Sequence, residues 1–542
     1  MSVPLLPRVA YFCMEYALSE EFPIYSGGLG VLAGDHVKSA ADLGVPLVAI
    51  GIFWSEGYTR QRLGPAGVPV DAYPVTPREA LTATGAKATV TIRGREVTLI
   101  AWRVNRHGAG ELYLLEPERE EDRWLTRRLY SGGPDLRVAQ EIVLGVGGVR
   151  MLRALGVAPD VYHFNEGHAV FAGLELVRER MVAGATFPAA CAAVRQEIVF
   201  TTHTPVLAGN ETHALPLLRE QGADLGAFSD EQLEALGGAP FGMTVAGLRL
   251  SRIANGVAAL HGETTRRMWK GVEGAAPITS VTNGVHSPTW QDSRVRAAYA
   301  AGPAAILAAH QEAKRELITE VRARSGVALA EERLIIGFAR RAASYKRADL
   351  ILRDPKMNPL LAEGRVQLVF SGKAHPNDTE GKQLVAALAA ASKRFPKSVV
   401  FLEDYEMRLG RLLTRGCDVW LNNPRRPMEA SGTSGMKAAM NGVLNLSVLD
   451  GWWPEGCEHG VTGWQLGDGY EGPGQDEHDL KALVAVLLGE VLPIWETDRA
   501  RWGQMMQASI AMSQWRFSSD RMVEEYYERI YRRAPLVRAA VG

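Results

Sequence analysis

Short runs of apolar, often β-branched residues alternate along the chain with longer stretches in which apolar residues recur at helical spacing. Such an alternation predicts an α/β fold with largely parallel sheets. The predicted strands are Val9–Phe12, Pro46–Ile52, Ala88–Ile92, Val97–Val104, Val161–Phe164, Ile198–Thr201, Leu334–Phe338, Gln367–Phe370, Val399–Leu402, Val419–Leu421 and Gly442–Ser447. The predicted helices are Gly34–Leu43, Asp135–Ala154, Ala169–Met181, Ala304–Arg324, Thr379–Lys393, Leu409–Arg415, Asp479–Glu490 and Asp520–Arg533.

The pattern begins afresh in the second half of the chain. The segment Arg333–Arg341 (RLIIGFARR) is typical of a first strand that runs into a polar loop, and it follows a charged helix ending near Arg324. We therefore place a domain boundary within residues 290–330. Two open α/β domains leave a cleft at the carboxyl ends of their strands, where ligands bind.

Composition narrows the class of protein. The 542 residues, 46% hydrophobic and 22% charged, are enough for more than one globular domain. A net charge of −1 argues against a generic nucleic-acid binder, which needs a basic excess. No apolar run is long enough to span a membrane, and the N-terminus lacks the pattern of a signal peptide, so we expect a cytoplasmic protein. Four scattered cysteines predict no disulfide framework.

A glycine-rich segment, Ser26–Asp35 (SGGLGVLAGD), precedes a predicted helix. Glycine lets the backbone approach a ligand, and free N–H groups at a helix start attract anions or sugar oxygens. Taken alone, an ordinary tight turn is the better interpretation.

The segment Phe200–His213 (FTTHTPVLAGNETH) places His203 just beyond a predicted strand. There it could donate to a substrate hydroxyl or carbonyl, or it could be a satisfied core histidine. A metal role is less favoured, because His213 does not lie at a helical i+4 spacing from it.

The segment Val281–Trp290 (VTNGVHSPTW) combines an Asn-Gly turn signal at Asn283 with an aromatic residue. Trp290 could stack on a planar ring or fill a core, and the sequence does not distinguish these.

Four basic residues crowd a predicted strand-to-loop junction: Arg340, Arg341, Lys346 and Arg347. The planar fork of arginine and the point charge of lysine together suit phosphate. A solvated basic turn is the alternative, but the position after an apolar strand favours a functional role.

Small residues run directly into a predicted helix within Pro424–Gly442 (PRRPMEASGTSGMKAAMNG). Successive N–H groups at such a start can cradle a phosphate, and Lys437 could hold a cofactor aldehyde as a Schiff base. The density of small residues makes a plain exposed loop the weaker alternative. The aromatic segment Leu449–Gly456 (LDGWWPEG) could either stack on sugars or form packing between domains.

Together these segments resemble the α-glucan phosphorylases, the family of glycogen, starch and maltodextrin phosphorylases. The carriers are SGGLG at 26–30, THT at 202–204, TNG with Trp290 at 282–290, Arg341 with Tyr345-Lys346-Arg347, and EASGTSGMK followed by NG at 429–442. The resemblance implies a GT-B fold of two Rossmann-like domains facing across an active-site cleft. It assigns residues 1–310 to the glucan side, 311–515 to the cofactor and phosphate side, and 516–542 to a C-terminal helix packing back on the first domain.

The implied reaction is reversible transfer of a terminal α-1,4-linked glucose to inorganic phosphate. It yields α-glucose 1-phosphate with retention and uses pyridoxal 5′-phosphate (PLP), whose phosphate assists acid catalysis. The implied partners are an α-glucan (glycogen, starch or maltodextrin), phosphate and glucose 1-phosphate, in a possible homodimer, without nucleic acid, membrane or metal.

Matched residue by residue, the resemblance gives each segment a role. Lys437 holds PLP covalently, with Gly432, Thr433 and Ser434 cradling its phosphate and Trp290, Tyr405 and Arg340 around it. Arg341 and Lys346 bind the substrate phosphate, and His203 acts as a positioner within the catalytic group. The glucose side comprises Ser26, Gly27, Gly28, Leu29, Asn283, Tyr345, Glu429, Ala430, Ser431 and Gly432.

Several positions depart from the family pattern. Ala17 stands where an aromatic contact to the cofactor is usual, Ser26 replaces an asparagine, Glu406 replaces an arginine near the ring, and Arg340 replaces a lysine with conservation of charge. The glycine loop begins early in the chain, so the regulatory sites of the longer animal enzymes are expected to be absent. The pattern fits a short bacterial-type member.

Two other functions remain open. A sugar-nucleotide glucosyltransferase of the glycogen-synthase kind shares SGGLG and the basic pair but leaves Lys437 without a role. A catalytically weak glucan-binding relative fits the departures at Ser26 and Glu406, but not the intact Arg341, Lys346, Glu429 and Lys437.

Overall fold

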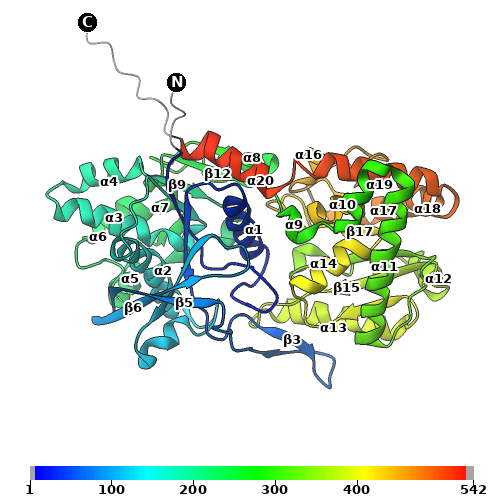
Figure 1. The fold of residues 1–542 in the computed structure, drawn as a ribbon, viewed down its shortest axis with the longest axis horizontal. Helices are drawn as coiled ribbons and strands as arrows, with labels where there is room; N and C mark the ends of the chain where they lie inside the picture. Colours follow the sequence, from blue (N-terminus) through cyan, green and yellow to red (C-terminus); the bar gives the residue numbers. More distant parts are fainter. Residues whose placement is uncertain (1–5, 533–542) are drawn as a thin grey trace, which may run out of the picture.

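The computed structural model describes residues 6–532, which form two sheet-centred regions side by side (Figure 1). Each sheet has its own large apolar core. The prediction of an α/β fold with largely parallel sheets is confirmed.

The first region is built on a nine-stranded sheet in the order β13-β12-β9-β8-β1-β2-β7-β6-β5. Its strands are β1 (Val9–Phe12), β2 (Leu47–Ile52), β5 (Leu81–Ile92), β6 (Arg95–Val104), β7 (Glu111–Pro117), β8 (Val161–Asn165), β9 (Ile198–Thr201), β12 (Ile253–Gly256) and β13 (Ile278–Ser280). In the sheet order, all neighbouring strands from β13 through β7 pair in parallel. The central strands of this part are continuously apolar because helices cover both faces of the sheet. β5 and β6 pair antiparallel at one edge, an arrangement that was not predicted from the sequence.

The helices of this region lie between the strands in sequence. They are α1 (Gly28–Asp42), α2 (Pro134–Ala154), α3 (Phe171–Val182), α4 (Phe187–Arg195), α5 (Leu215–Gln221), α6 (Asp230–Gly237), α7 (Met243–Leu250) and α8 (Ala259–Met268). A short pair, β10 (Thr212–His213) and β11 (Phe241–Gly242), lies beside them.

The second region holds a six-stranded, wholly parallel sheet in the order β16-β15-β14-β17-β18-β19. Its strands are β14 (Leu334–Ala339), β15 (Val366–Ser371), β16 (Val399–Leu402), β17 (Val419–Asn422), β18 (Leu444–Val448) and β19 (Gly463–Leu466). Its helices are α9 (Ser287–Trp290), α10 (Ser293–Ala298), α11 (Pro303–Ser325), α12 (Met357–Ala362), α13 (Thr379–Arg394), α14 (Met407–Gly416), α15 (Ser434–Ala439), α16 (Trp453–Gly456), α17 (Gln475–Val486), α18 (Leu492–Thr497) and α19 (Arg499–Ser513).

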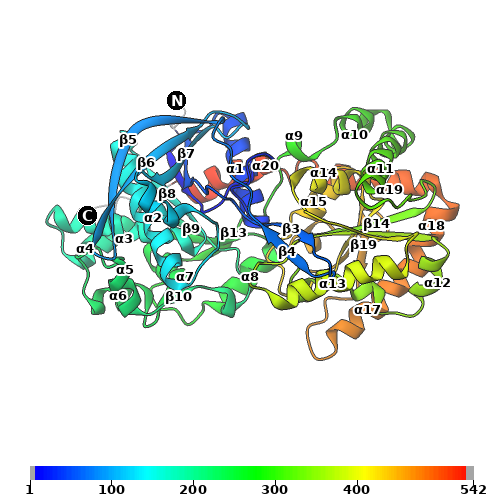
Figure 2. The same cartoon turned by 90° about the horizontal axis from the view of Figure 1, so that it is seen from below.

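Two segments cross between the regions. The helix α20 (Ser519–Glu525) returns to pack on α1, and its Met522 and Val523 are buried in the first core (Figure 1). The ribbon of β3 (Arg60–Leu63) and β4 (Pro69–Ala72) reaches from the first region toward α13 (Figure 2). The end of the predicted helix Asp520–Arg533 lies outside the described residues.

Some element boundaries differ from the predictions. α1 begins at Gly28, not Gly34, so the glycine segment is its first turn. The helix predicted at Asp479–Glu490 starts at Gln475 and continues into a π-helical turn. Cys13 and Cys417 are buried, and all four cysteines are free thiols. Within the described residues, none of the helices is both long enough and apolar enough to cross a membrane.

Candidate active site

One cavity of about 890 Å³ lies between the two regions, and every residue assigned a site role from the sequence is on its wall. From the first region these are Ser26, Gly27, Gly28, Leu29, His203 and Asn283. From the second they are Trp290, Arg340, Arg341, Tyr345, Lys346, Tyr405, Glu429, Ala430, Ser431, Gly432, Thr433, Ser434 and Lys437. His203, Arg340 and Tyr405 each follow the carboxyl end of a parallel strand, where open α/β sheets bind ligands.

Cations after β14 converge on one carboxylate. The ammonium of Lys346 and Nη1 of Arg340 both donate to Oε2 of Glu429, the latter at 3.2 Å. Burial alone favours the neutral acid, but these cations hold the pKa of Glu429 below its usual value. Arg341 is exposed to the cavity beside them. The group therefore presents positive charge suited to an anionic ligand.

Arg347, the fourth member of the basic cluster, is not part of this wall. Its buried guanidinium donates to Asp479 at 2.7 Å and to Asp476 at 3.1 Å. It also donates to the carbonyl of Asn423 at 2.8 Å. Arg347 thus anchors the loop that carries Lys346 instead of facing the ligand space.

Lys437 projects from α15 toward the cavity, with Nζ 3.5 Å from the centroid of the Trp290 ring. Burial lowers the pKa of Lys437 to about 8, an effect that Asp35 opposes and Lys38 adds to. A lysine with a pKa lowered toward neutrality is the form that reacts readily with a carbonyl group.

The backbone at the start of α15 needs its glycines. Gly432 has a φ of +78°, and a Cβ on Gly435 would lie 2.6 Å from Oδ1 of Asn445. The N–H of Lys437 makes the first intrahelical bond, to Thr433, so the amides before it lie at the open start of the helix. Oγ of Ser434 accepts from Nη2 of Arg340 at 3.2 Å, which ties this turn to the cationic group.

His203 is held from two sides. Its backbone N–H donates to Glu166 at 2.5 Å, and Nε2 lies 2.7 Å from Oδ1 of Asn165. Nδ2 of Asn165 donates to Sγ of Cys13, so the amide oxygen of Asn165 faces the imidazole. Because that oxygen can only accept, Nε2 of His203 carries the ring proton. Burial lowers the pKa of His203 to about 3, so the neutral ring suits positioning better than proton abstraction.

The glycine segment is fixed by Glu15. Its Oε2 accepts from the backbone of Ser26 at 2.6 Å and of Gly27 at 3.3 Å, and from the Ser26 hydroxyl at 3.1 Å. A Cβ on Gly30 would lie 2.6 Å from the same oxygen. The serine at this departure from the family pattern thus serves to hold the loop.

The other departures also have structural explanations. Glu406 caps α14, accepting from the backbone of Leu409 at 2.9 Å and of Arg408 at 2.5 Å, so its charge faces a helix start. Ala17 is buried in the apolar cluster that contains Trp290.

Asn283 connects the cavity to the C-terminal helix. Its carbonyl accepts from Nη2 of Arg521 at 3.1 Å. Its buried Oδ1 has no hydrogen-bond partner among the described residues. Trp452 and Trp453, whose role the sequence left open, are fully buried in the cluster with Ala17, which favours packing between the regions over sugar stacking.

An acidic part of the wall was not predicted from the sequence. Glu166 follows β8 directly, with a φ of +84°, and burial raises its pKa to about 7. The rule that identified His203, a polar residue beyond a strand end, would also have identified Glu166. Arg137 and Glu211, paired at 2.8 Å, also line the cavity and carry no local sequence signal.

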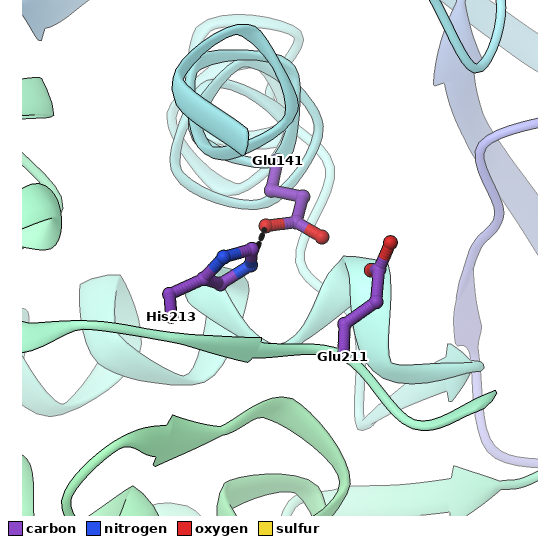
Figure 3. Close-up of side chains that lie close together, drawn as sticks. All are labelled: Glu141, Glu211 and His213. Carbon is purple, nitrogen blue, oxygen red and sulfur yellow. Dashed lines mark hydrogen bonds and ion pairs between the residues drawn. The ribbon is translucent and has the colours of Figure 1, made fainter. Parts of the chain in front are cut away.

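Glu141, Glu211 and His213 form a compact group beside this part (Figure 3). Nε2 of His213 lies 2.9 Å from Oε2 of Glu141. Burial favours the neutral acid, but Arg137 lowers the pKa of Glu211 to about 2. Burial and then Glu211 raise the pKa of Glu141. Arg137 thus supplies the positive charge that stabilises this group.

The fold and site define an α/β protein with a lysine-bearing cavity, one wall of which is cationic, between two largely parallel sheets. A family model described as carbohydrate phosphorylase matches residues 297–455. The chain is 40% identical to the maltodextrin phosphorylase of Thermococcus litoralis, over 97% of this chain and 70% of that protein. It is 35% identical to the glycogen phosphorylase of Aquifex aeolicus (96% and 86% covered) and 34% identical to an uncharacterised protein of Methanocaldococcus jannaschii (96% and 99%). The chain therefore belongs to the carbohydrate phosphorylase family, among the α-glucan phosphorylases.

Proposed function

We propose that this protein catalyses reversible phosphorolysis of the terminal α-1,4-linked glucose of an α-glucan, giving α-glucose 1-phosphate with retention and using PLP. The observation that carries the proposal is the placement of Lys437 on the same cavity wall as Arg341, Lys346 and Arg340. The α-glucan phosphorylases named above as relatives support the reaction class.

We further propose a GT-B arrangement of two Rossmann-like domains, predicted from the sequence as residues 1–310 and 311–515, with the segment from 516 returning to the first. Because α11 runs unbroken from Pro303 to Ser325 and Val295 lies in the second core, we place the division between the domains before α9. Two largely parallel sheets with separate cores and the packing of α20 on α1 support it. A homodimer, which rests on the family resemblance, and a cytoplasmic location, which rests on the sequence pattern, complete the proposal.

The residues present fit PLP. Lys437 has a depressed pKa and would hold the aldehyde, while the turn from Gly432 to Ser434 would receive the phosphate. The buried Nε of Arg340 has no hydrogen-bond partner among the described residues, although Nη2 of the same side chain reaches Ser434. A donor left free at this place suits an anionic group. When bound, PLP supplies a phosphate that acts as a proton partner for the substrate phosphate.

The chain's own residues then have defined tasks. Arg341 and Lys346 bind the substrate phosphate and offset the repulsion between two neighbouring phosphates. His203, Asn283 and the Ser26–Gly30 turn orient the terminal glucose. The substrate phosphate protonates the glycosidic oxygen, the C1–O bond breaks, and a phosphate oxygen bonds to C1 on the same face. Water must be kept out, because it would hydrolyse the same centre.

The test is a peptide map of protein incubated with PLP and reduced with borohydride, run beside a phosphorolysis assay. We expect one phosphopyridoxyl group, on Lys437, and release of glucose 1-phosphate from maltodextrin that depends on phosphate. No adduct, together with glucosyl transfer from ADP-glucose or UDP-glucose, would support the sugar-nucleotide transferase instead. An adduct without turnover on any α-glucan would support the weak glucan-binding alternative.

A further inference from the structure

A buried carboxylate contacts the same tryptophan as the reactive lysine and has no role in the proposed chemistry. Asp35 lies in the middle of α1 and is fully buried. Both of its side-chain oxygens accept from Nε1 of Trp290, at 2.8 and 3.0 Å. The ring of Trp290 in turn lies against the ammonium of Lys437.

Trp290 is fixed at its backbone as well as at its indole. Its carbonyl accepts from Nε of Arg415 at 3.0 Å and from Nδ2 of Asn441 at 3.1 Å. Nδ2 of Asn441 also donates to the carbonyl of Lys437 at 2.7 Å. The indole and the lysine therefore share one rigid frame, and the Asp35 hydrogen bonds set the tilt of the ring.

We propose that Asp35 is a positioning residue for Lys437: it fixes the Trp290 indole against the amine and places a negative charge at the N–H edge of the ring. This inference rests on the proposed function, because it assigns the residue that prepares the cofactor lysine.

The surrounding charges single out Lys437 as the cation that Asp35 influences. Asp35 faces Lys38 on its own helix, His286 from the segment before α9, and Lys437 from α15. Lys38 is held by the carbonyl of Leu18 at 2.8 Å and by Thr289 at 3.2 Å. His286 pairs with Asp42 at 2.8 Å. Of the three cations that face Asp35, Lys437 is therefore the one whose amine reacts when a carbonyl ligand binds.

The sign of the effect follows from this arrangement. Burial lowers the pKa of Lys437, and Asp35 raises it again, so loss of the carboxylate charge lowers it further. Only the neutral amine adds to the aldehyde carbon of PLP; one water leaves, and borohydride then delivers hydride to the C=N bond, giving a stable secondary amine. The pH dependence of adduct formation therefore reports the charge on Asp35, whatever the rate of phosphorolysis.

The experiment measures the rate of PLP adduct formation on Lys437 of the cofactor-free protein against pH, in wild type, Asp35→Asn and Asp42→Asn. The amide that replaces the carboxylate in Asp35→Asn keeps an oxygen to accept from Trp290 but removes the charge. We expect the midpoint of this variant to fall by about one pH unit, so that adduct forms about tenfold faster near pH 6. Asp42 lies on the same helix and is half exposed, and its variant is expected to follow wild type.

A second variant separates charge from orientation. Asp35→Ala removes both, and we expect it to lose unreduced PLP on dialysis about tenfold faster than Asp35→Asn. Superimposable pH profiles for wild type and Asp35→Asn, or equal PLP retention by Asp35→Asn and Asp35→Ala, would overturn the inference while leaving the cofactor in place. A wild type that forms no adduct on Lys437 at any pH would remove the proposed function, and this inference with it.

Discussion

The two walls of the cavity differ in charge. The wall from the second region carries Arg340, Arg341, Lys346, Lys373 and Lys437 against Glu406 and Glu429. The wall from the first region carries Glu15, Glu166 and Glu211 against Arg137. The first wall is thus acidic and hydrogen-bonding, and the second is cationic.

In the proposed reaction, the cationic wall would bind the phosphates and the acidic wall would bind the sugar. Phosphates are anions and need concentrated positive charge. The hydroxyls of a glucan are neutral and need hydrogen-bond donors and acceptors at fixed positions. Because the walls belong to different sheets, the two ligands meet only where the regions face each other. Changes on the second wall should therefore alter cofactor and phosphate use, and changes on the first should alter sugar use and pH response.

The largest effect is expected at Lys437. Lys437→Ala removes the covalent anchor for PLP, and phosphorolysis should fall about 10³-fold or more, as when a principal catalytic group is removed. Cofactor content after dialysis and the rate of glucose 1-phosphate release are the measurements. Lys481, exposed on α17, provides the control substitution to alanine. Full activity of Lys437→Ala without added amine would contradict the assignment.

Lys346 tests the second wall without the cofactor anchor. Lys346→Ala should raise the KM for phosphate about 10- to 100-fold, the range for loss of a charged hydrogen bond, while PLP stays bound. Arg340 still pairs with Glu429, so the wall keeps a cation beside that carboxylate. Lys356→Ala, an exposed lysine nearby in sequence, is the matched control. An unchanged phosphate KM would remove the role given to Lys346.

The two walls also differ in how far the sequence predicts them. Much of the second wall comes from two continuous segments, Gly337–Leu350 and Pro424–Gly442. The short spacing of glycine, lysine and arginine in them predicts this wall from the sequence. Arg347 shows the limit: its neighbours face the cavity, but its partner Asp479 lies far along the chain. Charge type predicted a basic cluster, and only tertiary contacts separate its ligand-facing members from its anchor.

The first wall is assembled from distant residues. Glu15, Arg137, Glu166 and Glu211 come from four separate segments, and nothing local marks Arg137 or Glu211. The fold class was predicted because buried parallel strands are continuously apolar. The antiparallel edge formed by β5 and β6 was missed because its register depends on a hairpin and on which face is covered, and the short apolar runs reveal neither.

Glu166 gives the first wall a pH response. Burial raises its pKa to about 7 in the folded protein, against about 4.3 in an unfolded chain. The folded state therefore binds the proton more tightly, and this contribution to stability, on the order of 3 kcal/mol, is present below about pH 4 and lost as the pH rises through about 7. Glu166→Gln does not titrate, so its Tm relative to wild type should rise between about pH 5 and about pH 8. Parallel Tm curves over that interval would show that Glu166 ionises normally.

The smallest effect is expected where the walls are joined. On the β3–β4 ribbon, Nε2 of Gln61 donates to the carbonyl of Ala374 at 3.2 Å, and Oε1 accepts from the N–H of the same residue at 2.9 Å. This pair crosses from the first region to the second. Gln61→Ala should lower the Tm by about 1 to 3 °C, because one buried hydrogen-bonding pair is lost in a large protein. It should leave cofactor content unchanged, since Gln61 is on neither wall.

Val68→Ala, at the exposed turn of the same ribbon, is the control. If both variants lower the Tm equally, the ribbon contributes through its own folding and not through the link between the regions; if Gln61→Ala alone also raises the KM for phosphate, the link helps to align the cationic wall with the acidic one.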